Sequence, residues 1–389
     1  MTRIGLRGQL GIFSVLFASG MWMSKVAQPL HYENAGALVA FGVGYAAMAI
    51  TGGFSFVWGA IADRLGELNA VRIGALVYAV GIAGRFLTDV APTVAFSVIA
   101  GAGASLALVG IRPWVRSRAT DEEIPSIVGG RNLGNQVGMF VGTVGAAALF
   151  AFVPGTDAGT LAALGVAPLL VVLGFVWLLM FGRTGAPVDL TAAAETSGRS
   201  SFRGLATKLA AIGVLSGFYV SLVTPYLPLF LTRGGLPDAA AAVVIAAMSF
   251  AQIAVTAVIA RRGTRARPFR LFLIAESVTG LLTLTVALAL SVSPILVAVL
   301  FIARAGFVAI AVTSEETIQY AVIPGNAAGF VFGISQTAFL IGDALGGALG
   351  APLWTMLGPT GLATIAGAAT LANAILLPAL LRTKAPVRS

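Results

Sequence analysis

The sequence has no cysteine and a single histidine, His31. The lack of cysteine excludes a disulfide framework, thiolate chemistry and a cysteine zinc site. One histidine also argues against histidine metal sites and catalytic triads. We therefore expect no bound metal and no cofactor.

Charged residues are scarce as well. Only 10% of the 389 residues are charged and 58% are hydrophobic, and the mean hydropathy is +0.95. No water-soluble domain carries such a surface. Because a membrane crossing takes about 20 residues, this length leaves room for roughly twelve helices. The composition therefore predicts an all-α polytopic membrane protein.

The chain divides into apolar stretches at proline, glycine and charge clusters. We expect each stretch to form one membrane-spanning helix. The first follows a basic N-terminus, as in a signal peptide, but it contains Lys25 and has no clear cleavage site, so we interpret it as a helix. The stretches lie at residues 10–30, 35–62, 70–89, 91–114, 124–152, 160–181, 205–231, 236–260, 269–290, 294–318, 325–352 and 359–381.

The formal net charge of +9 is compatible with nucleic-acid binding, but the positions of the basic residues argue against it. If the N-terminus lies inside, nearly all lysines and arginines of the loops fall on the cytoplasmic side, and only Arg233 falls outside. The positive-inside rule then places both termini in the cytoplasm. We expect a multi-pass protein of the plasma (cytoplasmic) membrane, surrounded by lipid. The basic residues within the apolar stretches are Lys25, Arg85, Arg131 and Arg304.

One break in the apolar pattern is longer than the others. Residues 182–204 are rich in Gly, Pro, Thr, Ser and charges, which is typical of a linker. The sequence therefore predicts an N-terminal bundle at 1–181, a cytoplasmic linker at 182–204 and a C-terminal bundle at 205–389.

Glycine spacing repeats between the two predicted bundles. The fifth and eleventh stretches carry glycines at identical spacing, namely Gly129, Gly138 and Gly142 in one and Gly333, Gly342 and Gly346 in the other. In the fifth stretch Gly134, Gly138 and Gly142 recur every four residues, so these three glycines form a smooth stripe against which a second helix can pack closely. The stripe is compatible with fixed packing and with sliding during transport.

A charged turn separates the second stretch from the third. Gly59, Asp63, Arg64 and Gly66 form the pattern G-x-x-x-D-R-x-G. This pattern resembles the signature between helices 2 and 3 of the major facilitator superfamily. The resemblance implies twelve transmembrane helices in two pseudo-symmetric six-helix bundles, and transport by alternating access.

By the same resemblance, Gly59, Asp63, Arg64 and Gly66 are gate residues. A carboxylate is stabilised by a helix N-terminus and by an arginine partner, and Arg112 near the end of the fourth stretch is the candidate partner. The alternative is that the charges only solvate a tight turn. The basic ending usual in the family is replaced here by Glu67-Leu68.

The glycines of the fifth stretch also resemble the antiporter signature G-x8-G-x3-G-P-x-x-G-G of drug and metabolite exporters. Gly129, Gly138 and Gly142 match, but Thr143 replaces the proline and two alanines replace the final glycine pair. This partial match favours export in exchange for protons.

Ionisable and polar groups within apolar stretches are the candidate substrate-binding residues, because each is costly in hydrocarbon unless paired or wetted. Trp22, Lys25 and Gln28 share one face of the first helix, which lines the central cavity in the family fold. The alternative for Lys25 is snorkelling to the outer headgroups.

A polar strip in the fifth stretch contains Arg131, Asn132, Asn135 and Gln136. It needs protein or water around it, so we expect it either to line the cytoplasmic half of the cavity or to join the two halves.

In the seventh stretch, Tyr219 and Tyr226 share a face and are candidates for hydrogen bonding and stacking with cargo. Tyr226 is also compatible with an interfacial aromatic belt. The neighbouring Pro225 and Pro228 predict a bend there.

The other candidates lie in the later stretches. Arg304 is placed near the midplane as a cargo ligand, and Gln336 shares a face with Asp343. We expect Asp343 to be the proton-coupling group, since a carboxyl that alternates between a dry neutral form and a wetted ionised form couples access to protonation. Glu276 is a second coupling candidate, or a structural partner of a basic neighbour. Glu315 is expected at the inner interface.

The leading hypothesis is a monomeric proton-coupled exporter of a small metabolite or drug, with anionic or zwitterionic cargo favoured. No G-x-x-x-x-G-K-[ST] loop is present in the sequence, so we expect no direct use of ATP. One alternative is a proton symporter that imports a small organic anion. A remote alternative is a polytopic membrane transferase, but its only candidate group, His31-Tyr32-Glu33, falls in a short outer loop. We therefore expect no enzyme.

Overall fold

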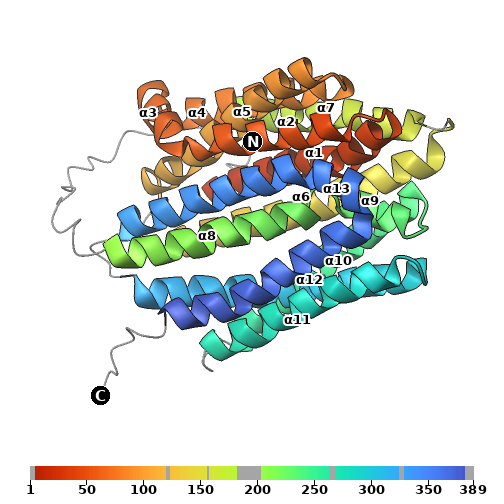
Figure 1. The fold of residues 1–389 in the computed structure, drawn as a ribbon. Helices are drawn as coiled ribbons and strands as arrows, with labels where there is room; N and C mark the ends of the chain where they lie inside the picture. The colour runs from red at the N-terminus through yellow and green to blue at the C-terminus, as the bar shows by residue number, and fades with distance from the viewer. Residues whose placement is uncertain are drawn as a thin grey trace. The chain divides into compact units, whose positions relative to one another are not determined.

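The computed structural model describes residues 5–119, 123–155, 157–181, 203–262, 268–323 and 328–381. These residues form α-helices joined by short turns and one 3-10 turn, η1 (Gly84–Phe86) (Figure 1). The helices are α1 (Leu6–Asn34), α2 (Leu38–Gly53), α3 (Ser55–Leu65), α4 (Glu67–Ala83), α5 (Val90–Arg116), α6 (Ile124–Phe152), α7 (Ala158–Phe181), α8 (Arg203–Val223), α9 (Leu227–Arg233), α10 (Asp238–Arg262), α11 (Pro268–Ala289), α12 (Pro294–Val322) and α13 (Ala328–Leu381).

The helices account for the predicted membrane crossings. Within the described residues, 10 helices are long and apolar enough to span a bilayer, and the bent pair α2 and α3 makes an eleventh. The 54 residues of α13 leave its helical path at Gly358, where φ is 67°. Because a crossing takes about 20 residues, α13 is long enough for two. The predicted all-α polytopic fold with twelve crossings is confirmed.

The second crossing is broken in its middle, which the sequence did not predict. α2 and α3 meet at Phe54 with a bend of 61°. The Thr51 carbonyl beside the kink accepts hydrogen bonds from the Phe54 backbone N–H at 3.4 Å and from the indole Nε1 of Trp58 at 2.8 Å. A side chain thus adds a second donor where the backbone hydrogen bond is long, as a bend in hydrocarbon favours.

The helix of the seventh crossing is interrupted at the prolines for which a bend was predicted. α8 ends at Val223, and α9 begins at Leu227 with Pro228 in its first turn. Proline has no backbone N–H and is favoured at the first positions of a helix, so this pair of prolines both ends one helix and starts the next.

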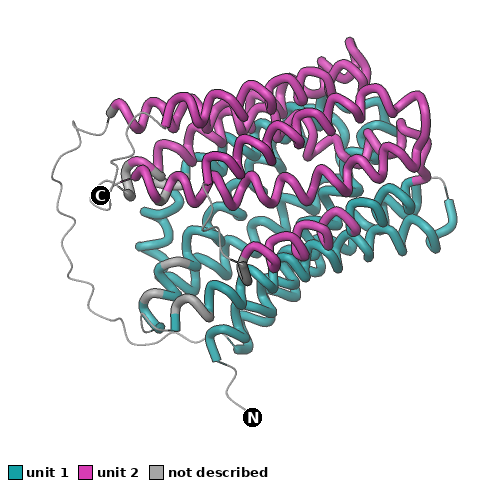
Figure 2. Tube along the Cα trace, turned by 90° about the horizontal axis from the view of Figure 1, so that it is seen from below, with its two compact units in different colours: residues 1–193, 238–246 teal, residues 194–237, 247–389 magenta. Residues whose placement is uncertain are grey.

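The chain divides into two compact units (Figure 2). Unit 1 contains residues 1–193 and 238–246, and unit 2 contains residues 194–237 and 247–389. The boundary therefore passes through α10 as well as through the predicted linker. Most of 182–204 lies outside the described residues, so the predicted bundle limits stay a prediction.

In unit 1 the glycine stripe of α6 packs directly on the backbone of α1. A Cβ atom added to a stripe glycine would lie within 2.4 Å of a main-chain carbonyl oxygen, far inside van der Waals contact. Only glycine allows the two helices to approach so closely. The facing pairs are Gly134 with Gly11, Gly138 with Val15, and Gly142 with Ser19.

Unit 2 repeats this arrangement between α13 and α8. A Cβ on Gly342 would lie 2.0 Å from the carbonyl oxygen of Val214, and one on Gly346 would lie 2.4 Å from that of Phe218. The repeated glycine spacing therefore corresponds to a repeated helix contact, α6 on α1 and α13 on α8. The expected close packing is confirmed, and the internal repeat is structural.

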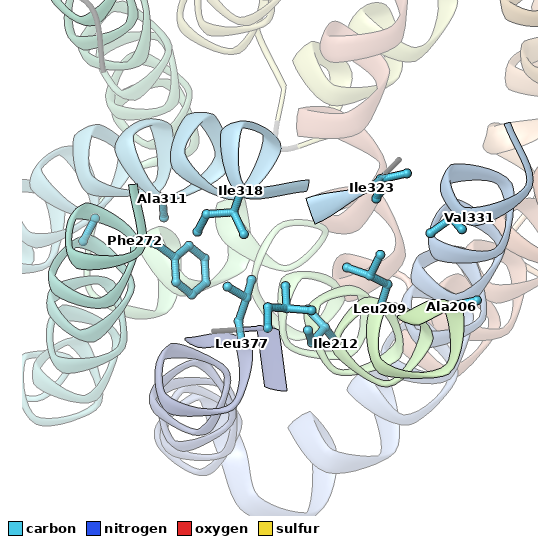
Figure 3. Close-up of a cluster of buried hydrophobic side chains, with 11 residues drawn as sticks. Ala206, Leu209, Ile212, Phe272, Ala311, Ile318, Ile323, Val331 and Leu377 are labelled. Atoms are coloured by element: carbon cyan, nitrogen blue, oxygen red, sulfur yellow. The ribbon is translucent and has the colours of Figure 1, made fainter. Parts of the chain in front are cut away.

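A hydrophobic cluster holds together α8, α11, α12 and α13 of unit 2 (Figure 3). Helices in lipid associate through van der Waals packing of this kind rather than through expulsion of water. The cluster lies next to Glu276 in the sequence through Ala275, so it fixes the position of that part of α11. Its buried members are Ala206, Leu209, Ile212, Phe272, Ala275, Ala311, Ile318, Ile323, Val331, Leu377 and Leu381.

Candidate functional site

A buried carboxyl lies at the meeting point of several unit 2 helices. Glu276 of α11 is only 4% exposed. The Tyr219 hydroxyl of α8 donates a hydrogen bond to its Oε1 atom, and Asn373 Nδ2 of α13 donates to the same oxygen at 3.3 Å. Asn373 Nδ2 also lies 3.1 Å from the Tyr219 hydroxyl. These three side chains therefore form one hydrogen-bonded group across three helices.

A buried base lies beside this acid. Arg304 of α12 is 7% exposed, and its Nε donates to Thr283 Oγ1 of α11 at 2.9 Å. Its positive charge interacts with Glu276. Two predicted site residues, Glu276 and Arg304, thus belong to one electrostatic environment. Thr283 and Asn373 were missed by the sequence analysis, because uncharged polar residues are common in membrane helices.

Glu315 of α12 joins the same electrostatic environment. Its charge interacts with Glu276, and Gln319 Nε2 donates to its Oε1 at 3.0 Å. The sequence analysis placed Glu315 only at the inner interface. The structure adds a carboxylate neighbour for Glu276, which the separation of the two residues in sequence does not indicate.

Asp343 occupies a different contact in unit 2. It lies half-buried on α13, and the fully buried Ser221 of α8 donates a hydrogen bond to its Oδ1 atom. Gln336, two turns earlier on α13, is exposed. Asp343 therefore belongs to the α8 and α13 contact, and no hydrogen bond between Asp343 and Gln336 is recorded among the described residues.

Tyr226 packs in the interior of unit 2 between α8 and α9. Its side chain is fully buried, and its hydroxyl donates to the carbonyl of Gly347 at 3.4 Å. Its ring stacks on Trp354, with centroids 5.9 Å apart and an interplanar angle of 20°. Contact with cargo at this residue stays a prediction.

In unit 1, Lys25 lies over an aromatic ring of its own helix. Its Nζ atom is 4.9 Å from the centroid of the Trp22 ring, a distance at which a cation–π interaction forms. Both side chains are half-buried, whereas Gln28 is buried. The shared face predicted for Trp22 and Lys25 is confirmed, while their contact with cargo stays a prediction.

Arg85 is the unit 1 residue that the site prediction left out. It lies in η1 and is only 6% exposed. Its Nη1 donates to Ser24 Oγ of α1 at 2.6 Å, and its Nη2 lies 3.6 Å from the Met48 sulfur of α2. Its position inside an apolar stretch was the signal that pointed to it. The tyrosines whose side chains interact with it are Tyr32, Tyr45 and Tyr78.

The polar strip of α6 is only partly buried. Arg131 and Gln136 are half-buried, and Asn132 and Asn135 are exposed. The Gln136 Oε1 atom is buried without a hydrogen-bond partner among the described residues.

The gate motif spans the end of α3. Asp63 and Arg64 are exposed, and Gly66 ends the helix at φ +80°, the left-handed region that favours glycine. A Cβ on Gly59 would meet only ordinary contact, so space does not demand a glycine there. Arg112 lies in α5, but its side chain lies outside the described residues.

Glu67, the departure from the usual basic ending, has a partner within unit 1. Ser117 Oγ donates to Glu67 Oε2 at 2.5 Å, which joins the start of α4 to the end of α5. Burial lowers the pKa of the nearby Arg118 guanidinium, and the Glu67 carboxylate opposes that shift. The acid also lies in the first turn of α4, where the helix dipole favours negative charge.

Comparison with known families agrees with the fold and the motif. The family model described as Major Facilitator Superfamily matches residues 10–347. The chain belongs to the Major Facilitator Superfamily. A search of curated protein sequences finds no match.

Several solved major facilitator structures share this fold. The nucleoside transporter NupG is 15% identical and has a TM-score of 0.77, with 98% of this chain and 100% of that chain covered. A D-xylose-proton symporter is also 15% identical, with a TM-score of 0.76 and 95% of each chain covered. A bacterial homologue of the human lysosomal transporter Spinster is 13% identical, with a TM-score of 0.69 and 96% and 94% covered.

These likenesses establish the fold, and the family establishes the class of function. The protein is a multi-pass membrane protein and a secondary transporter of a small-molecule substrate. Its family and fold are those of transporters, which are not enzymes.

Proposed function

We propose that this major facilitator is a proton-coupled transporter that works by alternating access and exports a small metabolite or drug. An anionic or zwitterionic cargo fits best, since Lys25, Arg131 and Arg304 all lie within membrane-spanning helices. The transporter acts as a monomer in the plasma membrane, with both termini cytoplasmic. Orientation follows from the distribution of basic residues in the loops.

The observation that carries the proposal is the buried group around Glu276. An acid buried in a membrane-spanning helix is functional by default, because hydrocarbon is a poor solvent for its charge. Here the acid is hydrogen-bonded by Tyr219 and Asn373 and lies near Arg304. Adding a proton to Glu276 removes a negative charge that acts on Arg304 in the same unit.

Protonation at this point affects several helices at once. A charged carboxylate only accepts hydrogen bonds, whereas a protonated one donates one as well. The contacts from Tyr219 and Asn373 must therefore rearrange when Glu276 binds or loses its proton. Since these residues come from α8, α11 and α13, proton binding biases the packing of three crossings, which is how a local charge change drives a conformational equilibrium.

Asp343 is the second coupling group in this proposal. Its hydrogen bond from Ser221 joins α13 to α8, the closely packed pair that mirrors α6 and α1. Gain or loss of a proton by Asp343 therefore changes a hydrogen bond within the contact of α13 with α8. At the cytoplasmic end, Asp63, Arg64 and Arg112 serve as gate residues, with Gly59 and Gly66 shaping the turn.

The proposal is tested in oriented vesicles. A thermal-shift screen of small metabolites on the purified protein first supplies a ligand, whose radiolabelled form is then used for flux. In inside-out vesicles an acidic interior should drive accumulation, because an exporter exchanges outgoing protons for incoming cargo.

Two other results would change the proposal. Accumulation only in right-side-out vesicles with an acidic exterior would replace export by proton symport of an imported anion. If accumulation of cargo is the same with and without a pH gradient in both vesicle orientations, proton coupling would be contradicted.

A further inference from the structure

Arg85 is a buried cation whose recorded partners in unit 1 are all neutral. Ser24 and Met48 accept from its guanidinium, and tyrosines surround it. No carboxylate of the described residues interacts with it. The acids nearest to it in sequence at the same end of the helices, Glu33 and Asp89, are not among its partners.

The sequence explains this lack of a counter-charge. Acids in the described part of unit 1 fall at or near helix ends and in the turns between them, never in the middle of a crossing. They are Glu33, Asp63, Glu67, Asp89, Glu123, Asp157 and Asp238. The interior of the unit therefore holds cations without acids.

The buried arginine of unit 2 has different surroundings. Arg304 is as buried as Arg85, but an acid, Glu276, is among the groups that interact electrostatically with it. Burying a guanidinium without such a partner costs several kcal/mol. Unit 2 has an acid near its buried arginine, whereas the described part of unit 1 has none near Arg85. Arg85 is therefore available to an anion from outside the protein.

The groups around Arg85 are suited to a carboxylate. A guanidinium presents a planar fork of N–H donors that matches two carboxylate oxygens. Tyrosine hydroxyls add further donors. The Tyr32 hydroxyl donates to the Leu87 carbonyl at 2.6 Å, and Tyr45, half-buried on α2, interacts electrostatically with Arg85.

Lys25 extends the positive charge toward the surface of unit 1. It follows Ser24, the direct partner of Arg85, in the sequence, and its side chain is half-buried. A second cation in the same unit raises the local concentration of anions at its surface.

We propose that Arg85 is the anchor for the carboxylate of a small organic anion, with Ser24 and Tyr45 beside it, and that this anion is the cargo. The identification of the anion as cargo rests on the proposed function. The binding itself does not, because it is measured without any gradient or transport.

The test is equilibrium binding to the purified full chain, read as the melting temperature against ligand concentration. The probes are acetate and benzoate, with acetamide and benzamide as neutral analogues of the same shape and chloride as an inorganic anion. The proposal predicts that a carboxylate stabilises the protein at concentrations where its amide and chloride do not.

Variants assign that effect to Arg85. Arg85→Gln should weaken carboxylate binding about tenfold or more, and Arg85→Lys less, because lysine keeps the charge and loses the fork. Arg72→Gln is the matched control: Arg72 lies in the same crossing but donates to the Leu178 carbonyl and does not touch the cluster. Its carboxylate affinity should equal that of the wild type.

Several outcomes of these binding measurements would overturn the proposal. Equal stabilisation by carboxylates and amides, equal stabilisation by chloride, or unchanged carboxylate affinity in Arg85→Gln would each overturn the proposal. If Arg85→Gln does not fold, Tyr45→Phe takes its place, since it keeps the guanidinium and should weaken carboxylate binding severalfold; unchanged affinity there would also overturn it. A failure of proton coupling at Glu276 leaves all these results unaffected.

Discussion

Tyr219 and Glu276, 57 residues apart in sequence, share a buried hydrogen bond in which the phenol donates to the carboxylate. The bond joins α8 to α11, and Asn373 extends it to α13. A buried polar network costs free energy when some of its polar atoms lack hydrogen-bond partners. When all of them are paired, it favours one packing arrangement of the helices. The Asn373 Oδ1 atom has no recorded partner among the described residues, so the network accepts one further donor.

Tyr219→Phe should shift the pH dependence of transport without abolishing cargo binding. The phenylalanine removes the hydroxyl that donates to Glu276 and leaves the ring in its place. Because that hydrogen bond stabilises the charged carboxylate, its loss changes the balance between the charged and protonated forms of Glu276. Transport rate against pH in proteoliposomes checks the shift. Tyr226→Phe is the control, since its hydroxyl donates to a backbone carbonyl instead.

Asp343→Asn should abolish accumulation driven by a proton gradient while it spares exchange of cargo. The amide keeps the size of the side chain and can still accept the hydrogen bond from Ser221, but it cannot titrate. Counterflow and gradient-driven uptake are measured side by side. Uptake with the pH dependence of the wild type would remove Asp343 from the coupling mechanism.

Gly138→Ala should destabilise the protein, because its Cβ would lie 2.4 Å from the Val15 carbonyl oxygen. Overpacking of this kind costs about 1–3 kcal/mol. Gly129→Ala on the same helix is the matched control, since nothing lies within 4 Å of its Cβ. Thermal unfolding in detergent should show a lower melting temperature for the first variant only, and equal melting temperatures would refute the close α6 and α1 contact.

Asp63→Asn should reduce turnover more than it reduces stability. Asp63 is exposed at the end of α3 in this structure, so its charge contributes little to folding, whereas the gate proposal needs that charge during the transport cycle. Initial flux and melting temperature are compared in one preparation. Wild-type flux would leave Asp63 as a residue that solvates the turn.

Much of the fold follows from local sequence signals. Apolar length defines the crossings, Pro225 and Pro228 define the bend after α8, and the glycine stripe of α6 predicts a close helix contact. The bend at Phe54 has a weaker signal, the glycine pair Gly52-Gly53, which permits a kink without specifying one. It lacks a proline, and the hydrogen bond from Trp58 to a carbonyl seven residues earlier is revealed only by the folded helix pair.

Part of the candidate site was also predictable from local sequence signals. A charged residue in an apolar stretch stands out, so Glu276, Arg304 and Asp343 were recognised from the sequence. Which of them are neighbours depends on helix rotation and packing, and the sequence does not specify these. The electrostatic interaction of Glu276 with Arg304, and the neutral surroundings of Arg85, therefore emerged only from the structure.

The measurement that tests the account most directly is the transport of Glu276→Gln in proteoliposomes, with and without an imposed pH gradient. Glutamine keeps the shape of the side chain and an oxygen for Tyr219 and Asn373, but it binds no proton in the physiological range. Proton coupling through Glu276 predicts that exchange of cargo persists while gradient-driven accumulation falls to the level of exchange alone. Accumulation at the wild-type level, with the wild-type dependence on pH, would contradict the account.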